Sequence, residues 1–149
     1  MVDYRFPESR ILVFAKAPVM GQVKTRMQTA LSEQHCLELY QQLLMHCLQQ
    51  VCQCGLAPVE LWVTAQHPYW DRLRQQYNVR LCFQQGDDLG QRMSHAMNES
   101  LSHSRSVVII GSDCPAIDSD YLAEAFTSLA ESPPVVLGPA LDGGYVLLG

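Results

Sequence analysis

The sequence predicts an α/β protein, a three-layer α/β/α domain built on a mainly parallel sheet. Short apolar runs alternate with helical stripes along the whole chain of 149 residues, and this alternation favours parallel strands with helices on both faces. The run Val107–Ile110 is unbroken and β-branched, as in a strand buried on both faces. Hydrophobic residues make up 48% of the chain and charged residues 17%, which is typical of a globular protein. We therefore expect a single domain over residues 1–149.

The first strand and the first helix have the plainest patterns. Ile11–Ala15 is a short apolar run, and a helix is predicted around Glu33–Cys54 because apolar residues recur there every three or four positions. Ser32 is a suitable N-cap for this helix and Gly55 a suitable C-terminal stop. The predicted inner face consists of Leu37, Tyr40, Leu44, Leu48 and Val51.

The later elements keep the alternation. A strand at Val59–Thr64, a short helix at Tyr69–Gln76 and a strand at Val79–Phe83 come next. A third helix begins near Leu89, and its predicted inner face consists of Leu89, Met93, Ala96, Met97 and Leu101. After the buried strand, Asp118 or Ser119 caps a fourth helix that carries Leu122, Ala125, Phe126 and Leu129 on one face. Two short strands end the chain, at Val135–Leu137 and Tyr145–Leu148.

Charge and hydropathy exclude several classes of function. Lys and Arg number 10 against 15 Asp and Glu, so the net charge is −5 and the chain lacks the basic face that nucleic acids and membrane surfaces require. No apolar run approaches the roughly 18 residues of a membrane span, and Met1–Arg10 lacks the apolar core of a signal peptide. We expect a cytoplasmic protein that binds neither nucleic acid nor membrane.

The six cysteines and five histidines show no metal-binding spacing. None of the cysteines forms a Cys-x-x-Cys pair, and Cys47, Cys54 and Cys82 lie in apolar stripes or runs. We interpret all six as reduced and mostly buried small apolar residues.

The loop Lys16–Arg26 concentrates positive charge in an otherwise acidic chain. Lys16, Lys24 and Arg26 are three of the ten basic residues, and no acid lies between them. The loop directly follows the first strand and contains Gly21. Cations on a Gly/Pro loop after a strand indicate a site for the phosphates of a nucleotide. The alternative is a solvated basic loop.

Three other loops are expected beside it. In an open α/β sheet, ligands bind beyond the carboxyl ends of the strands. The loops at this edge would be Lys16–Arg26, Gln85–Gly90, Gly111–Asp118 and Pro139–Gly144, which are also the segments richest in reactive side chains. Their convergence predicts one ligand site.

Asp113 and Asp142 are the candidate catalytic acids. Asp113 follows the buried strand, where a carboxylate facing phosphates would suit Mg²⁺ or Mn²⁺; the alternative is a cap for the next turn. Asp142, before two glycines, would be a second ligand or would orient an acceptor hydroxyl; the alternative is a tight turn between strands.

The loop Gln85–Gly90 has its own set of candidate contacts. Gly86 and Gly90 would let a base or ribose lie against the backbone. Arg92 would reach a phosphate from the first turns of the helix, unless it is simply a surface cation. Asp87 or Asp88 caps that helix.

Four ordered motifs resemble a known family. Phe14–Arg26, Gln85–Met93, Ile110–Pro115 and Leu137–Tyr145 are similar to those of a bacterial family of glycosyltransferase-A-like proteins, the selenodomain-associated transferases. That family has the nucleotide-diphospho-sugar transferase fold (GT-A, Rossmann-like) and resembles the guanylyltransferases of molybdenum-cofactor and phospholactate metabolism.

The resemblance implies a nucleotide across the first loop, with Lys24 and Arg26 near its phosphates. It places Asp113 where the wider superfamily puts its metal-binding acid. Two departures leave details open. The full Asp-x-Asp is absent, which leaves the metal stoichiometry undecided. Lys16, Ala17 and Pro18 replace the usual Gly-Gly-rich signature, which weakens the transfer of guanine specificity.

Family members continue well beyond the Asp-Gly-Gly-Tyr strand, whereas this chain stops at Gly149. We expect much of the acceptor side to be missing, either because the chain is truncated at its C-terminus or because it is a short member with impaired catalysis. Apolar surface left exposed in this way would favour self-association into a homo-oligomer.

Three functions are compatible with these observations. The first is a metal-dependent transferase that uses a nucleotide-activated donor and a small-molecule acceptor, with glycosyl transfer from a nucleotide sugar preferred. The second is a nucleotidyltransferase, guanylyltransferase-like, that releases pyrophosphate. The third is a nucleotide-binding module without turnover.

Overall fold

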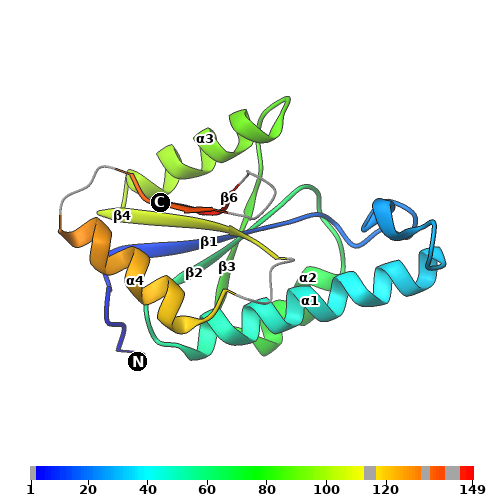
Figure 1. Cartoon of the computed structure of the whole chain (residues 1–149), viewed down its shortest axis with the longest axis horizontal. Coiled ribbons are helices and arrows are strands. Elements are labelled where there is room, and N and C mark those ends of the chain that lie inside the picture. The colour runs from blue at the N-terminus through cyan, green and yellow to red at the C-terminus, as the bar shows by residue number, and fades with distance from the viewer. Residues whose placement is uncertain (1–2, 113–116, 132–134, 140–144) are drawn as a thin grey trace.

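The chain forms a six-stranded sheet between two layers of helices (Figure 1). The computed structural model describes residues 3–112, 117–131, 135–139 and 145–149. The strands are β1 (Ser9–Ala15), β2 (Val59–Val63), β3 (Val79–Phe83), β4 (Ser106–Gly111), β5 (Leu137–Pro139) and β6 (Tyr145–Leu148). The helices are α1 (Glu33–Gln53), α2 (Tyr69–Gln76), α3 (Leu89–Leu101) and α4 (Ser119–Ala130), with a 3₁₀ turn η1 (Thr25–Met27) before α1.

The sheet has the order β3-β2-β1-β4-β6-β5. β1 pairs in parallel with β2 and β4, and β2 pairs in parallel with β3. β6 runs antiparallel to both β4 and β5. The mainly parallel sheet predicted from the alternation of strands and helices is therefore confirmed, with its four parallel strands side by side.

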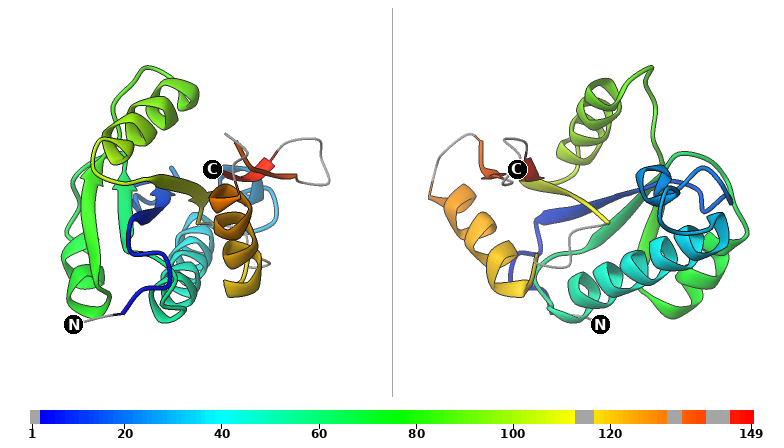
Figure 2. Two further views of the ribbon diagram at one scale, coloured as in Figure 1. Left: turned by 90° about the vertical axis from the view of Figure 1, so that its left-hand side faces the viewer. Right: turned by 45° about the vertical axis from the view of Figure 1, so that its right-hand side comes forward.

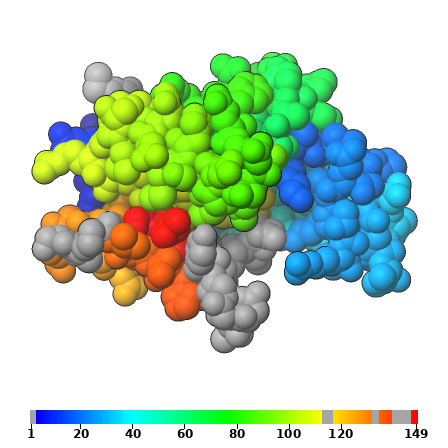
Figure 3. Space-filling model, turned by 90° about the horizontal axis from the view of Figure 1, so that it is seen from above, coloured from blue at the N-terminus to red at the C-terminus, as the bar shows by residue number. Residues whose placement is uncertain are grey.

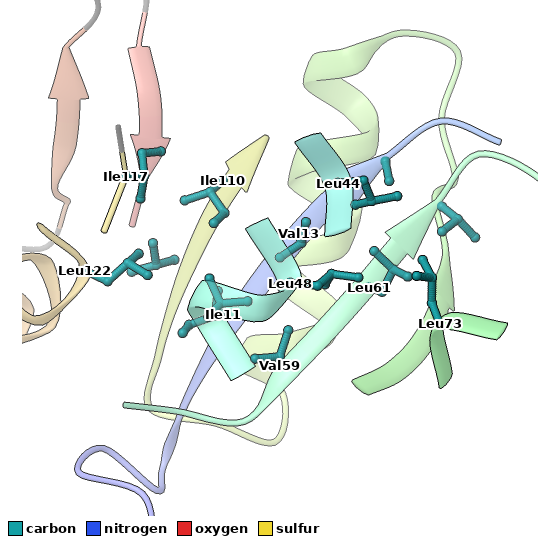
Figure 4. Packing of buried hydrophobic residues seen from close by; sticks show 14 of the residues in the cluster. Ile11, Val13, Leu44, Leu48, Val59, Leu61, Leu73, Ile110, Ile117 and Leu122 are labelled. Carbon is teal, nitrogen blue, oxygen red and sulfur yellow. The ribbon is translucent and has the colours of Figure 1, made fainter. Parts of the chain in front are cut away.

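The larger core lies between the sheet and the helices α1, α2 and α4, which share one face (Figures 1 and 2). Ile11 and Val13 of β1 point toward Leu44 and Leu48 of α1 in the close view (Figure 4). All four side chains are fully buried. The stripe with a spacing of three or four residues on α1 is thus the reason that this helix covers the sheet.

The opposite face of the sheet is covered by α3 (Figure 2). Met93 and Ala96 pack there against Leu12, Trp62 and Ile109. The prediction of three layers with helices on both faces is therefore confirmed. Among the described residues, none of the helices is long and apolar enough to cross a membrane.

The inner face of α3 differs from the prediction at both ends. Leu89 is 62% exposed and Leu101 43% exposed, whereas Ser100 is fully buried. The Ser100 hydroxyl donates to Oε1 of Glu60, a buried carboxylate on β2, at 2.6 Å. This hydrogen bond turns Ser100 toward the sheet and leaves its neighbour Leu101 facing outward, because a buried carboxylate requires partners.

The fifth strand begins two residues later than expected. It spans Leu137–Pro139 instead of Val135–Leu137, because the pairing with β6 sets its limits: Leu137 lies opposite Leu148 and Pro139 opposite Tyr145. A proline, which has no N–H to donate, is tolerated here because β5 is an edge strand.

The predicted helix ends are confirmed by their hydrogen bonds. The Ser32 hydroxyl accepts from the His35 N–H at the start of α1, and Gly55 has a φ of +65° just beyond its end. The Asp118 carboxylate accepts from the Tyr121 N–H at the start of α4. These caps satisfy N–H groups that have no partner within the helix.

The five cysteines in the described part are free thiols. Cys36 is buried and the others are partly buried. Burial raises the pKa of the Cys52 thiol and that of Cys82 to about 11 each. Such thiols stay protonated near neutral pH and lack the thiolate that reacts. This agrees with the interpretation of the cysteines as small apolar residues. Cys114 lies outside the described residues.

Candidate functional site

A cavity of about 760 Å³ opens at the carboxyl edge of the parallel strands, and we call it the edge cavity. Each of these four strands contributes residues at or just after its end: β1 with Phe14–Lys16, β2 with Thr64, β3 with Gln84, and β4 with Gly111 and Ser112. The loop after β1, α1 and the first turn of α3 complete the lining. Three of the four predicted loops, those after β1, β3 and β4, thus contribute described residues to one cavity. The end of β2 joins them without having been predicted, and Pro139 of the fourth predicted loop is not among the lining residues, while residues 140–144 lie outside the described part.

Positive charge gathers in this cavity. Lys16, Lys24, Arg26 and Arg92 all line it, and within the described part of the chain no acidic side chain does. Four of the ten basic residues thus share one cavity in a chain whose net charge is −5. Several like charges around one space repel each other unless an anion enters it. The arrangement is suited to a polyphosphate.

The first loop, Lys16–Arg26, has a left-handed turn at two places. Gly21 has a φ of +84°, and Lys24 has a φ of +51°. Lys24 is the one non-glycine residue with positive φ in the part of the chain that the structure describes. A side chain in this conformation costs roughly 1–2 kcal/mol. Strain of this kind is found mainly at functional sites.

Residues from other elements hold the start of this loop. The Tyr40 hydroxyl of α1 donates to the Lys16 carbonyl at 2.6 Å, and the Thr64 hydroxyl oxygen accepts from the Ala17 N–H at 3.0 Å. Tyr40 and Thr64 also line the edge cavity. Each tether therefore positions the loop directly beside the space that a ligand would occupy.

Beyond Gln84, the loop that leads from β3 into α3 (residues 85–88) is held by local contacts instead. The Asp88 carboxylate accepts from the Gln91 N–H at 2.8 Å and caps α3, as the sequence predicted for this position. The Gln91 side chain accepts from the Asp87 N–H at 2.8 Å. Nε of Arg92 donates to the Gly86 carbonyl at 3.1 Å. This last bond fixes the base of the Arg92 guanidinium at the edge cavity.

An apolar wall lies beside the cations. Phe14, Val23, Met27 and Leu89 line the same cavity as Lys24. Leu89 and Met27 are partly exposed there. An apolar or aromatic ring placed against them would remove this surface from water, which favours binding by about 25 cal/mol per Å² of apolar area.

The predicted site residues are four cations, three glycines and two acids, and the structure treats these groups differently. Lys16, Lys24, Arg26 and Arg92 come together in the edge cavity. Gly21, Gly86 and Gly90 are not among its described lining residues. Their contacts with a nucleotide stay a prediction.

The geometry gives Gly86 a structural role. Its φ is +143°, and a Cβ there would lie 2.7 Å from Gln91 Cβ and 2.8 Å from the Arg92 nitrogen. Only glycine fits this approach of the loop to α3.

The two candidate acids, Asp113 and Asp142, lie outside the described residues. Ser112, directly before Asp113, is buried and lines the edge cavity together with Lys24. Within the described residues, no group of three or more His, Cys, Asp or Glu could hold a metal ion. The chain's metal ligands stay a prediction that rests on Asp113.

Sequence reasoning missed Tyr40, Thr64, Gln84 and Leu89 as cavity residues. The sequence pattern placed Tyr40 and Leu89 on the inner faces of helices and gave no indication that they line a cavity. Thr64 and Gln84 are single polar residues after strands and form no motif. The position directly after a strand in a parallel sheet is the one signal that would have found these two.

A family model and several solved structures match this chain. The chain belongs to the family described as an uncharacterized protein conserved in bacteria (DUF2064), whose model matches residues 47–149. No match was found among curated proteins.

One similar structure is a protein from Desulfovibrio desulfuricans that carries the provisional designation of nucleotide-diphospho-sugar transferase. The two share 30% sequence identity with a TM-score of 0.83, and the match covers 95% of this chain and 62% of that one. The nucleotide-diphospho-sugar transferase fold predicted from the sequence, and the resemblance to glycosyltransferase-A-like proteins on which it rested, are therefore confirmed.

Two further structures share the fold at lower identity. A cytidylyltransferase from Leptospira borgpetersenii matches at 18% identity with a TM-score of 0.59, over 95% of this chain and 60% of that one. A 4-diphosphocytidyl-2C-methyl-D-erythritol synthase matches at 12% identity with a TM-score of 0.60, over 91% and 61%. The chain thus spans about three-fifths of the length of these relatives.

Proposed function

We propose that this protein transfers a group from a nucleotide-activated donor, and that the group is a sugar carried by a nucleotide diphosphate. The observation that supports this proposal is the gathering of Lys16, Lys24, Arg26 and Arg92 at the carboxyl edge of the sheet. The name of the Desulfovibrio relative points to the same donor class.

The cations would act on the charge that develops as the donor breaks. Glycosyl transfer leaves a nucleoside diphosphate, whose terminal phosphate gains negative charge as the bond to the sugar lengthens. Lys24 and Arg26, placed beside that phosphate, would stabilise this charge. The bond between Arg92 Nε and the Gly86 carbonyl holds the guanidinium in place and so reduces the entropy that binding would cost.

A divalent cation completes the proposal. Mg²⁺ or Mn²⁺ on Asp113 would further neutralise the leaving diphosphate. In the sequence, Asp113 directly follows Ser112, and Ser112 lines the edge cavity. Asp142 is proposed to position the acceptor, which we infer to be a small molecule.

Nucleotidyl transfer is the second candidate. It keeps the same phosphate site but breaks the bond between the α- and β-phosphates of a nucleoside triphosphate and releases pyrophosphate. The fold shared with the cytidylyltransferase and the diphosphocytidyl synthase favours this candidate. Binding of a nucleotide without turnover is the third candidate, since the cations that line the edge cavity would hold phosphates in either case.

A thermal-shift screen tests the common basis of these candidates. Nucleoside diphosphates, nucleoside triphosphates and nucleotide sugars are added with and without Mg²⁺ or Mn²⁺. Ligands that bind the folded state raise the melting temperature. We expect stabilisation by diphosphates or their sugar conjugates, and a well-folded sample that no nucleotide stabilises would refute the phosphate site.

Variants then assign the residues. Lys24→Ala and Arg26→Ala should each weaken diphosphate binding about 10- to 100-fold, the loss expected for a charge-assisted hydrogen bond. Arg105→Ala is the matched control, because Arg105 is highly exposed and pairs with Glu8. Asp113→Ala should abolish the metal-dependent part of the stabilisation. If that part survives unchanged, Asp113 is not a metal ligand.

Product analysis separates the candidates. Release of a nucleoside diphosphate from a nucleotide sugar indicates glycosyl transfer, and release of pyrophosphate from a triphosphate indicates nucleotidyl transfer. Binding with neither product, in the presence of metal and a panel of acceptors, supports the module without turnover.

A further inference from the structure

Gln84 lies at a position in the edge cavity that no motif predicted. It directly follows β3, and its backbone N–H donates to the Val63 carbonyl at 2.9 Å, which continues the ladder between β2 and β3. Its side chain is half-buried and lines the cavity. The backbone of Gln84 is therefore fixed by the sheet, and only the side-chain amide can adapt.

Two strands fix the orientation of that amide. Nε2 of Gln84 donates to the Trp62 carbonyl of β2 at 2.9 Å and to the Ala15 carbonyl of β1 at 3.4 Å. An amide turned the other way would press Oε1 against two carbonyl oxygens. Because a carbonyl oxygen accepts and never donates, this reversed orientation is disfavoured. Both N–H groups are thus used by the sheet, and Oε1 is the atom left to meet a ligand.

Oε1 of Gln84 has no donor among the described residues. It is an acceptor on a side chain that the protein holds in place and that lines the edge cavity. Such an atom favours a ligand that brings an N–H or O–H group. It repels phosphate oxygens, which at neutral pH are acceptors. The cavity therefore offers cations to phosphates, at Lys24 and Arg26, and an acceptor to a different group, at Gln84.

We propose that Gln84 is a specificity-determining residue, whose Oε1 accepts a hydrogen bond from an N–H or O–H donor on the nucleoside part of the ligand. The proposal rests on the proposed function, in which the ligand is a nucleotide. A base N–H and a ribose hydroxyl offer the same donor chemistry. Leu89, exposed in the same cavity, provides an apolar surface for the nucleoside beside this acceptor.

Calorimetric titration with trimmed ligands tests this assignment. The nucleoside diphosphate that the wild type binds most tightly is compared with analogues that each lack one donor, either a base N–H or amino group or one ribose hydroxyl. One of these deletions should weaken wild-type binding about 5- to 100-fold, because it leaves the acceptor without a partner once the bound ligand has displaced water from it. In Gln84→Met the same deletion should not weaken binding any further, since the variant already lacks the Oε1 acceptor.

The control variant is Gln85→Met, which changes the next, exposed side chain and should keep the wild-type preference. Circular dichroism and melting of the free protein check folding. If Gln84→Met does not fold, Gln84→Asn replaces it, because it withdraws the amide by one methylene. The analogues that lack a base donor and those that lack a ribose hydroxyl then show which of the two groups donates to Gln84.

Two failures are distinguishable. If the wild type binds no nucleotide, the proposed function fails and the role of Gln84 fails with it. If the wild type binds nucleotides but every deletion weakens the Gln84 variant as much as the wild type, only the role of Gln84 is refuted.

Discussion

The two loops that bring cations to the edge cavity are held by different means. The first loop, Lys16–Arg26, is tied by Tyr40 and Thr64, which come from α1 and from the end of β2. The loop between β3 and α3 is anchored to the sheet only at its first residue, Gln84; residues 85–88 are tied by Asp88, Gln91 and Arg92, all within a few residues of them. One loop therefore depends on the packing of the whole domain, whereas the other is built from local helix-capping contacts.

The two loops differ both in which residue has a positive φ and in how far away the supporting residues lie in the sequence. The first loop carries a lysine with a positive φ, and its supports are 24 and 47 residues away in sequence. The second loop places its positive φ of +143° on Gly86, which has no Cβ. We infer that remote substitutions alter phosphate binding through the first loop, and that the second loop responds mainly to changes within itself.

The largest effect is expected in the second loop. Gly86→Ala should lower the free energy of unfolding by about 1–3 kcal/mol, because it forces an alanine into a conformation reserved for glycine and presses its Cβ against Gln91 and the Arg92 backbone. Urea unfolding measures the change. The control is Gly90→Ala, inside α3, where a Cβ meets only Asp88 Oδ1 at 3.3 Å and helix propensity rises. Equal losses in both variants would contradict this role of Gly86.

A smaller effect is expected from a remote support of the first loop. Tyr40→Phe should lower the free energy of unfolding by about 1–2 kcal/mol, because the Lys16 carbonyl loses its 2.6 Å donor. It should also weaken diphosphate binding without touching any charge. Tyr77→Phe is the control, since its bond to the Met45 carbonyl is 3.5 Å long and contributes little. Unchanged binding in Tyr40→Phe would show that the loop keeps its position without this tether.

The smallest effect tests the strain at Lys24. Lys24→Gly and Lys24→Ala both remove the charge, but only glycine relieves the positive φ. Lys24→Gly should therefore be more stable than Lys24→Ala by about 1 kcal/mol, while both lose diphosphate affinity to a similar degree. Chemical denaturation and titration measure the two quantities separately. Equal stabilities would mean that the loop relaxes and stores no strain at this residue.

Local patterns carried much of the prediction. The spacing of Tyr40, Leu44 and Leu48 defined a helix face, and Ser32 and Asp118 marked helix starts, because capping and periodicity involve neighbours within a few positions. The alternation of elements then implied parallel strands, whose shared carboxyl edge brought Lys24 and Arg92 to one place.

Contacts between distant residues decided the rest. Ser100, rather than Leu101, faces the sheet because Glu60 is buried beneath it, 40 residues away in sequence. The position of β5 followed from its pairing with β6, which no propensity encodes. The sequence pattern therefore did not determine which side chains at the ends of α3 face the sheet, nor where the edge strand β5 begins and ends. Packing and strand pairing determined both.

By itself, the sequence determined the layered fold and the concentration of positive charge after the first strand, because both follow from short-range periodicity and from residue order. Only the tertiary structure decided that Tyr40, Thr64 and Gln84 meet the same cavity as those cations. The anchors of Gln84 lie 22 and 69 residues away, on two other strands. Their meeting depends on how the strands pair, and so it becomes visible only when the sheet is assembled.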